Sequence, residues 1–409
     1  MGSMISLGLG RLEVDWGKNN FFINHSKLFL PGDIAPAIYY YAEGHQETQS
    51  AFVRKLRSVI KRLELLGYTM DECRRHYEES AELLPDYYPD PEISFDMLRR
   101  ALRSVDVTRM LIPQDSDYDL GEFAARAILS DPEFTKTEAE LTSLTEYDGT
   151  FFENLGPYVI LRLLGENPNN LDQEVVWCYQ DVVDGGWAEE SRLYEGLSDA
   201  DRYLIVTEGS SDASILRSAL PLVEPDVADF FDFVDMTENY PFTGTGNLVR
   251  FCQGLARIRI QNKILVVLDN DTAGLLAFQR IRSLSLPRNM RVTLLPSLDE
   301  MSGITTLGPS GESVEDVNGK AVSIECFLDF EFGPKTPPAI RWTSFNPDLG
   351  VYQGELLNKE QYARSFFENS KDASYDLQKL GYLWDHLIRS CIVTDNAESA
   401  VFQGQLWDG

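Results

Sequence analysis

The sequence predicts an α/β domain built on a parallel sheet with helices on both faces, preceded by a mainly helical N-terminal domain. Four short apolar runs after residue 200 have the composition of buried strands, at 203–207, 230–234, 264–268 and 291–295. Helical segments alternate with these runs, at 212–220, 247–260 and 273–283. Fully apolar strands that alternate with helices are typical of a parallel sheet buried on both faces.

The first 195 residues show mainly helical patterns. Apolar residues recur at spacings of three and four over residues 50–66, at Phe52, Leu56, Val59, Leu63 and Leu66. This periodicity predicts an amphipathic helix that ends at Gly67. Further helices are expected at 93–104, 120–129 and within 153–186, and a short strand pair between Leu12 and Leu30.

These patterns divide the chain into three parts. We expect a mainly helical domain over residues 1–195, the α/β domain over 196–335, and a C-terminal helical extension over 336–409 that completes it. The Gly-, Ser- and acid-rich stretch 302–320 resembles a flexible insertion, and the extension shows helical patterns at 359–369 and 373–388.

The charge is strongly negative but unevenly distributed. The 409 residues contain 36 Lys and Arg against 65 Asp and Glu, a net charge of −29, which opposes nonspecific binding to nucleic acid by the chain as a whole. Between Thr243 and Leu295, however, eight basic residues accompany two acidic ones. Solvated helix faces would explain these charges; the alternative hypothesis is that Arg250, Arg257 and Arg280 flank an acidic site and contact a phosphate backbone.

Several classes of protein are disfavoured by composition. The five cysteines are scattered and form no CxxC pair, which argues against a structural zinc site and against a disulfide framework. No apolar run approaches the roughly 20 residues that a membrane-spanning helix needs. We therefore expect a cytoplasmic protein without a membrane segment.

Acidic residues follow two of the predicted strands. Glu208 and Asp212 come after the first strand, and Asp269 and Asp271 come directly after the third. Ligands of such sheets bind at the carboxyl ends of the strands, which meet at one edge. Carboxylates that gather there repel each other unless a cation neutralises them, and Mg²⁺ accepts such oxygen ligands.

These residues resemble the Toprim signature, E-G-x-x-D after one strand and D-x-D-x-x-G after a later one. The matching residues are Glu208, Gly209, Asp212, Asp269, Asp271 and Gly274. Toprim domains occur in bacterial primases, type IA and II topoisomerases, RecR-type recombination proteins and OLD-family nucleases. The resemblance implies a Rossmann-like fold and phosphodiester chemistry with two Mg²⁺ or Mn²⁺ ions.

The resemblance also implies residue roles. Glu208 would act as a general acid or base or as a metal ligand, Asp269 and Asp271 would hold the metal, and Asp212 would support the first loop and a second ion. OLD-like domains add an acid after the fourth strand and a lysine downstream, for which Glu325 and Lys359 are the candidates. A solvated glutamate and a surface lysine are the alternatives, and Lys320 competes with Lys359.

Most of the chain resembles proteins that join a HEPN/Toprim-associated N-terminal domain to a Toprim domain. The residues that carry this resemblance are 5–7, 12–19 and 158–164, together with the Toprim motifs. HEPN ribonucleases use an Arg followed four to six residues later by His, and none of the four histidines follows an Arg at that distance. We therefore expect the N-terminal domain to scaffold, dimerise or recognise a partner.

The leading functional hypothesis is a metal-dependent endonuclease that cleaves DNA or RNA, with tRNA among the candidate substrates. Proteins of this organisation are associated with bacterial defence against phages, which implies an effector role, a regulatory ATPase or sensor protein as partner, and a homo-oligomer. A topoisomerase would need a larger gated architecture, and a primase would need clustered cysteines. The alternative is a non-catalytic Toprim module, as in RecR-type proteins, that binds nucleic acid or a protein partner.

Overall fold

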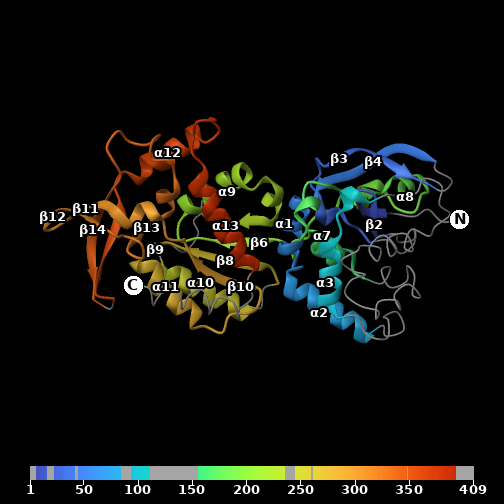
Figure 1. Cartoon of the computed structure of the whole chain (residues 1–409). Coiled ribbons are helices and arrows are strands. Elements are labelled where there is room, and N and C mark those ends of the chain that lie inside the picture. The colour runs from blue at the N-terminus through green and yellow to red at the C-terminus, as the bar shows by residue number, and fades with distance from the viewer. Residues whose placement is uncertain are drawn as a thin grey trace. The chain divides into compact units, whose positions relative to one another are not determined.

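The computed structural model describes residues 6–15, 23–41, 45–83, 94–110, 155–234, 245–258, 261–347 and 349–392. The chain divides into two compact units, Met1–Ser198 and Asp199–Gly409 (Figure 1). Each unit contains its own sheets and is considered by itself. The helix predicted at 120–129 lies outside the described residues.

The N-terminal unit is built on a five-stranded antiparallel sheet. Its strands are β1 (Ser6–Leu9), β2 (Leu12–Asp15), β3 (Ile34–Tyr40), β4 (Gln46–Lys55) and β5 (Glu174–Cys178), in the order β2-β1-β5-β4-β3. Strand β5 lies at the centre, although it comes more than a hundred residues after β4 in the chain. Its Trp177 side chain is fully buried and stacks on Phe52 of the neighbouring β4 and on Phe29, so aromatic packing holds β4 and β5 together.

Helices cover this sheet and complete its core. They are α1 (Leu56–Leu66), α2 (Met70–Leu83), α3 (Phe95–Ser104), α7 (Pro157–Leu164) and α8 (Gln180–Asp184), with 3-10 turns η1 (Ser26–Leu28), η4 (Val107–Arg109), η6 (Pro168–Asn170) and η7 (Glu190–Tyr194). Helix α7 is the most apolar, and Val159, Leu161 and Leu164 are buried in the core. Helix α1 ends at Gly67 in the left-handed conformation, as the sequence predicted.

The strand content of this unit exceeds the prediction. The helix expected over 50–66 begins only at Leu56, because residues 46–55 form β4, which pairs with β3 on one side and β5 on the other. Phe52 fits the helical spacing to Leu56 by coincidence, since it is buried against Trp177 from a strand. Of the strand pair expected between Leu12 and Leu30, only β2 falls in that range; it pairs with β1, which begins earlier at Ser6, and the two form the outer part of the larger sheet.

The C-terminal unit contains the predicted parallel sheet. Its strands are β6 (Tyr203–Val206), β7 (Phe231–Phe233), β8 (Lys263–Leu268) and β10 (Met290–Leu294), in the order β10-β8-β6-β7 with every pair parallel. All four coincide with the apolar runs of the sequence, so the mixed α/β prediction with a parallel sheet is confirmed. Strands β6 and β8 are neighbours, which brings the two acidic segments that follow them to one edge of the sheet.

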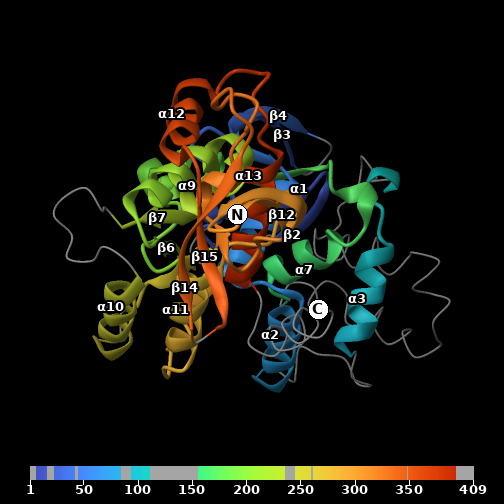
Figure 2. The same cartoon turned by 90° about the vertical axis from the view of Figure 1, so that its left-hand side faces the viewer.

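Helices lie on both faces of this sheet. They are α9 (Ser210–Val223), α10 (Thr245–Ile258), α11 (Thr272–Arg282), α12 (Lys359–Asn369) and α13 (Gln378–Ile392), with 3-10 turns η8 (Pro225–Phe230), η9 (Asp299–Gly303) and η10 (Ile324–Phe327). Ile264 and Val266 of β8 share a core with α10 and α11. Helices α9 and α13 cover the opposite face (Figures 1 and 2). On that face, His386 of α13 forms a hydrogen bond with Thr293 of β10 at 3.0 Å.

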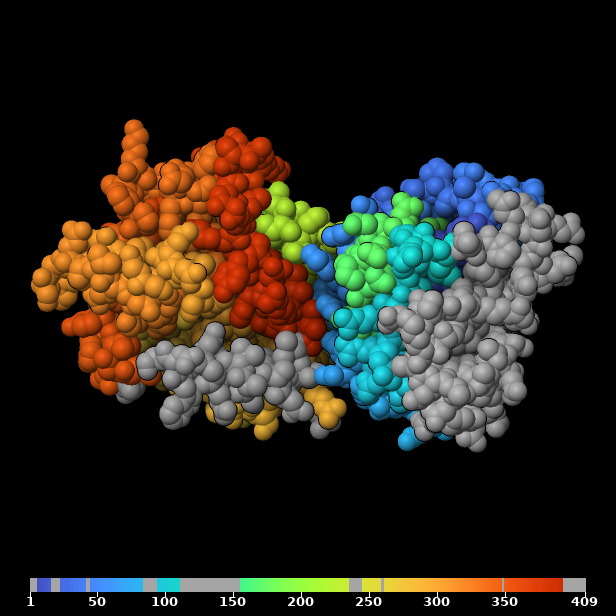
Figure 3. All heavy atoms as spheres, viewed as in Figure 1, coloured from blue at the N-terminus to red at the C-terminus, as the bar shows by residue number. Residues whose placement is uncertain are grey.

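A second four-stranded sheet follows the parallel one. Strands β11 (Ile304–Gly308), β12 (Gly311–Glu315), β14 (Ala339–Asn346) and β15 (Val351–Leu356) form it in the order β12-β11-β14-β15, and the short β13 (Ala321–Val322) pairs with β9 (Asn270–Asp271). In Figure 3 the atoms of these strands (orange) border those of α12 and α13 (red).

This sheet corrects two expectations. The stretch 302–320 is not a flexible insertion, because it contains the β11–β12 hairpin. The C-terminal extension is not purely helical, because β14 and β15 precede its helices. The alternation of Ile340, Trp342 and other apolar residues with polar ones in 339–346 is a strand signal that the helical reading of this region missed.

No helix within the described residues is long and apolar enough to cross a membrane.

One buried carboxyl in the N-terminal unit gives a pH-dependent prediction. Burial, and to a lesser extent the neighbouring Asp15, raises the pKa of Glu13 on β2 to about 8. One of its oxygens is buried without a hydrogen-bond partner. The folded state therefore keeps this proton up to about pH 8, whereas the unfolded chain releases it near the ordinary value of 4.5. Glu13 thus costs stability increasingly as the pH rises through that window.

Glu13→Gln removes this cost because the amide is neutral at every pH. We expect little change in melting temperature at pH 5 and a gain of about 1–3 kcal/mol in unfolding free energy at pH 8. Thermal melting of the variant and the wild type at pH 5 and pH 8 measures this difference in stability. Glu174→Gln, at an exposed position of β5, is the matched control and should show no such difference. Equal effects of Glu13→Gln at both pH values would contradict the prediction.

Candidate functional site

The first acidic segment of the C-terminal unit follows β6. Glu208 leaves the strand, Gly209 is the N-cap of α9, and Asp212 lies in the first turn of that helix. The backbone N–H of Gly209 donates to Asp212 Oδ2 at 3.0 Å, which fixes the turn. Glu208 Oε1 is buried and has no hydrogen-bond partner.

The second acidic segment follows β8, the neighbour of β6. Asp269 ends the strand, and Asp271 is the N-cap of α11, where its Oδ1 accepts the backbone N–H of Gly274 at 2.7 Å. A Cβ at position 274 would lie 2.1 Å from the Asp269 carbonyl oxygen, so only glycine allows the helix to approach the strand this closely.

Glu325 joins these residues from the η10 turn. Its side chain is only 5% exposed, so the alternative of a solvated glutamate does not hold. Ser323 Oγ donates to its Oε2 at 2.7 Å, and Ser211 Oγ donates to its Oε1 at 3.4 Å. Burial raises the pKa of Asp212, and the negative charge of Glu325 adds to this effect.

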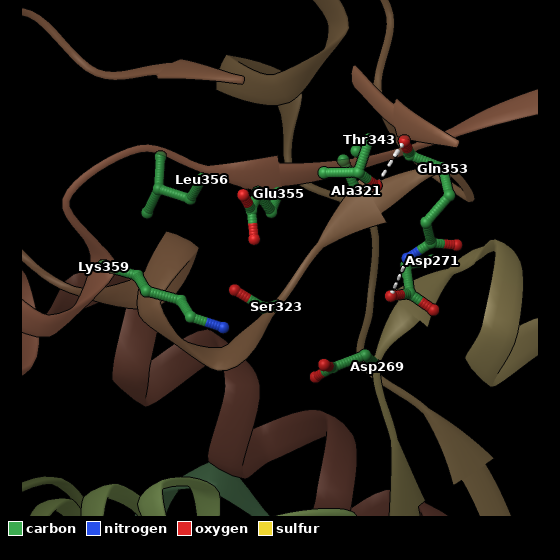
Figure 4. A pocket seen from close by; sticks show the side chains of 10 residues that line it. Asp269, Asp271, Ala321, Ser323, Thr343, Gln353, Glu355, Leu356 and Lys359 are labelled. Atoms are coloured by element: carbon green, nitrogen blue, oxygen red, sulfur yellow. Dashed lines mark hydrogen bonds between the residues drawn. The ribbon is translucent and has the colours of Figure 1, made fainter. Parts of the chain in front are cut away.

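Lys359 reaches the same site from the first turn of α12. With Asp269, Asp271 and Ser323 it lines one pocket (Figure 4). Its charge lowers the pKa of Asp212 and of Asp271, which opposes the effect of burial on both. The competing Lys320 instead donates from Nζ to the Asp316 carbonyl oxygen at 2.9 Å. Of these two lysines, Lys359 is therefore the one whose side chain lines the pocket with the carboxylates.

These residues form what we call the carboxylate cluster: Glu208, Asp212, Asp269, Asp271 and Glu325. Burial is the largest cause that raises the pKa of Glu208 to about 8 and that of Asp212 to about 7. Burial also raises the pKa of Asp269 well above its usual range, and the neighbouring carboxylates add to this effect. Several of these groups therefore hold protons at neutral pH unless a positive charge replaces those protons.

The chemistry of the carboxylate cluster fits a hard divalent cation. All its donors are oxygens, which Mg²⁺ and Mn²⁺ prefer, and Glu208 Oε1 is a buried acceptor without a partner. Among the residues that the structure describes, no group of three or more Asp, Glu, His or Cys side chains is already arranged to hold a metal ion. Binding would therefore require carboxylate side chains to turn toward the ion.

The three arginines suggested for nucleic-acid binding are exposed and lie on α10 and α11, which pack side by side (Figure 2). Arg250 lies in the second turn of α10 and Arg257 in its last turn. Arg280 lies in the last turn of α11, about 12 Å along the helix from Thr272. Arg280 is therefore remote from Asp271 and not directly beside the carboxylate cluster.

Sequence reasoning missed several residues of the site. Gln353 and Glu355 on β15 and Ser323 before η10 line the pocket with Asp269 and Asp271. The side-chain amide of Gln353 donates a hydrogen bond to the carboxylate of Asp271. No local pattern marks these residues, because β15 comes some eighty residues after Asp271 in the chain and reaches it only through the second sheet.

The fold and the site define a mixed α/β protein that presents buried carboxylates at the carboxyl edge of a parallel sheet. Residues 1–201 match the family model described as HEPN/Toprim N-terminal domain 1. The match supports a HEPN/Toprim-associated protein with a nuclease-like or otherwise nucleic-acid-related function, and it covers none of the carboxylate cluster. No curated protein and no solved structure matches the chain.

The close approach at Gly274 gives a stability prediction. Gly274→Ala must push α11 away from β8, and we expect a loss of about 2–4 kcal/mol in unfolding free energy. Gly254→Ala is the matched control, because Gly254 lies in α10 with open space around its Cβ position. The control should gain about 0.5–1 kcal/mol from helix propensity. Chemical denaturation measures the unfolding free energy of both variants. Equal changes in Gly274→Ala and Gly254→Ala would contradict the packing argument.

Proposed function

We propose that the C-terminal unit is a Toprim-type, metal-dependent endonuclease that cleaves phosphodiester bonds of DNA or RNA. The observation that carries the proposal is the carboxylate cluster itself. Five acidic side chains from β6, α9, β8, the α11 cap and η10 meet at one edge of the parallel sheet, beside Lys359. Buried charges of one sign destabilise a fold, so their retention at one place is best explained by a cationic ligand.

The cation would neutralise the charge that develops on the attacked phosphate, and two ions would fit the usual arrangement for such displacements. Asp269 and Asp271 would hold the first ion, while Asp212 and Glu325 would support the second. Glu208, whose pKa of about 8 lies near neutrality, would exchange a proton with the attacking or leaving oxygen. Lys359 would contact a non-bridging phosphate oxygen.

The arginines support a nucleic-acid substrate. Arg250 and Arg257 are seven residues apart on α10, so they lie on one side of the helix, and Arg280 adds a charge on α11. Within the described part of the chain, no carboxylate forms a salt bridge with any of the three. Exposed guanidinium groups in a chain of net charge −29 fit contact with a phosphate backbone.

The biological setting belongs to the same proposal. We infer a cytoplasmic effector of bacterial anti-phage defence, with the N-terminal unit mediating homo-oligomerisation or contact with a regulatory ATPase or sensor protein. The matched family supports only the general relation to nucleic acids.

Cleavage assays test the enzymatic proposal. The protein is incubated with plasmid, single-stranded DNA and total tRNA, in Mg²⁺, in Mn²⁺ and in chelator. We expect cleavage only with metal, and a loss of at least about 100-fold in Glu208→Gln and Asp269→Asn. Glu368→Gln, at an exposed position of α12, is the control and should cleave like the wild type.

Absence of cleavage by the wild-type protein on every substrate, with binding retained, would contradict the endonuclease. It would favour the alternative, a module that binds nucleic acid without cutting it.

The salt dependence of binding tests the arginines. Arg250→Ala, Arg257→Ala and Arg280→Ala should each weaken binding to a nucleic acid of any sequence. Each should also reduce the slope of log K against log salt by about 1, because one phosphate contact is lost. Fluorescence anisotropy over a salt series measures this. Arg75→Ala is the control, since Arg75 on α2 is paired with Glu72 and Glu79. Unchanged slopes for all three variants would contradict the assignment.

A further inference from the structure

Gln353 connects the second sheet to the carboxylate cluster. It lies on β15, and its side-chain amide makes two contacts at the start of α11. The Nε2 group donates to Asp271 Oδ2 (Figure 4). The Oε1 atom accepts the backbone N–H of Ala273 at 3.1 Å. The amide therefore bridges the carboxylate of the N-cap residue and a backbone donor of the first helical turn.

The backbone around Gln353 is held firmly in place. The Thr272 hydroxyl donates to the Tyr352 carbonyl oxygen at 3.4 Å, and the Gly354 N–H donates to the Lys320 carbonyl oxygen at 3.0 Å. A Cβ on Gly354 would lie 2.6 Å from Ile340 and 2.9 Å from Ala321, so β15 packs as closely as a glycine permits. Contacts on both sides of Gln353 thus define where its side chain can reach.

Both oxygens of Asp271 are engaged by donors from the protein. Oδ1 accepts from Gly274 and Oδ2 accepts from Gln353. These two hydrogen bonds favour the charged form of Asp271 and oppose the effect of its burial. The backbone N–H of Ala273 also lowers the pKa of Asp271, so the carboxylate is held by donors of the α11 cap and by Gln353. Without Gln353, Oδ2 would lose its donor while the repulsion from Glu208 and Asp269 remained.

We infer that Gln353 is a positioning residue of the carboxylate cluster, which acts by holding the Asp271 carboxylate in one orientation from the second sheet. The inference rests on the proposed metal-dependent function, because the orientation matters to a cation that Asp271 helps to hold. Groups that orient metal ligands in this way generally influence affinity for the metal as well as activity. The second sheet is then part of the functional site and not an appendage to the parallel sheet.

Titration of the full-length protein with Mn²⁺ in a calorimeter tests the inference. Gln353→Leu removes both contacts at similar volume, and we expect Mn²⁺ to bind about 10-fold more weakly or worse. Ser344→Ala is the control, because Ser344 is exposed and lies opposite Gln353 on β14. The control should bind Mn²⁺ like the wild type. Equal affinity in Gln353→Leu and wild type would overturn the inference.

A double-mutant cycle separates positioning from a general structural effect. If Gln353 acts through Asp271, adding Gln353→Leu to Asp271→Asn should change Mn²⁺ affinity no further. Additive losses would show that Gln353 acts independently of Asp271 and would overturn the inference.

Gln353→Glu gives a second measurement that does not depend on metal. The new carboxylate keeps an acceptor for Ala273 N–H but replaces the donor to Asp271 with a like charge. We expect a lower melting temperature than the wild type in chelator at neutral pH. A residue that only capped α11 would instead be unaffected or stabilised, since a negative charge favours a helix N-terminus. An unchanged or raised melting temperature would therefore contradict the contact with Asp271.

The outcomes distinguish this inference from the proposed function. If the wild-type protein bound no Mn²⁺, the metal-dependent function would fail and the positioning role with it. If the wild type bound Mn²⁺ and Gln353→Leu bound it equally well, only the role of Gln353 would fail.

Discussion

The mutual repulsion of five partly buried carboxylates is the constraint on which the C-terminal unit depends. Bringing Glu208, Asp212, Asp269, Asp271 and Glu325 together costs free energy through desolvation and through like charge. The raised pKa values of Glu208 and Asp269 express this cost. The surrounding packing must supply the stability that the site gives up, and it does so through apolar strands buried on both faces of the parallel sheet.

The rigid frame around the site keeps these charges near each other. The order β8-β6 places the two acidic segments side by side, and Gly274 lets α11 pack directly against the end of β8. Backbone N–H groups at the starts of α9 and α11 hold Asp212 and Asp271. The acids therefore belong to helix caps and to residues that follow strand ends, and a bound ion would require rotation of their side chains.

The second sheet and α12 complete the site with residues of other chemistry. Lys359 offers a positive charge, the amide of Gln353 offers a donor to Asp271, and Ser323 and Ser211 donate to Glu325. Gln353 and Lys359 favour the ionised form of Asp271 and oppose the effect of its burial. The arginines of α10 and α11 lie on an exposed helical surface of the same unit, and Arg280 is remote from the carboxylate cluster.

The sequence by itself determined the parallel sheet, its four strands and the acids Glu208, Asp212, Asp269 and Asp271, because strand composition and the residues directly after each strand are local properties. It misplaced the start of α1, where the helical spacing continues back into β4, and it missed β14 and β15 because the region 336–409 was expected to be helical. Only the tertiary structure decided that Glu325 is buried, that Lys359 and not Lys320 lies at the cluster, and that Gln353 contacts Asp271. These contacts join segments that are distant in sequence, and their formation depends on long-range packing that no local pattern encodes.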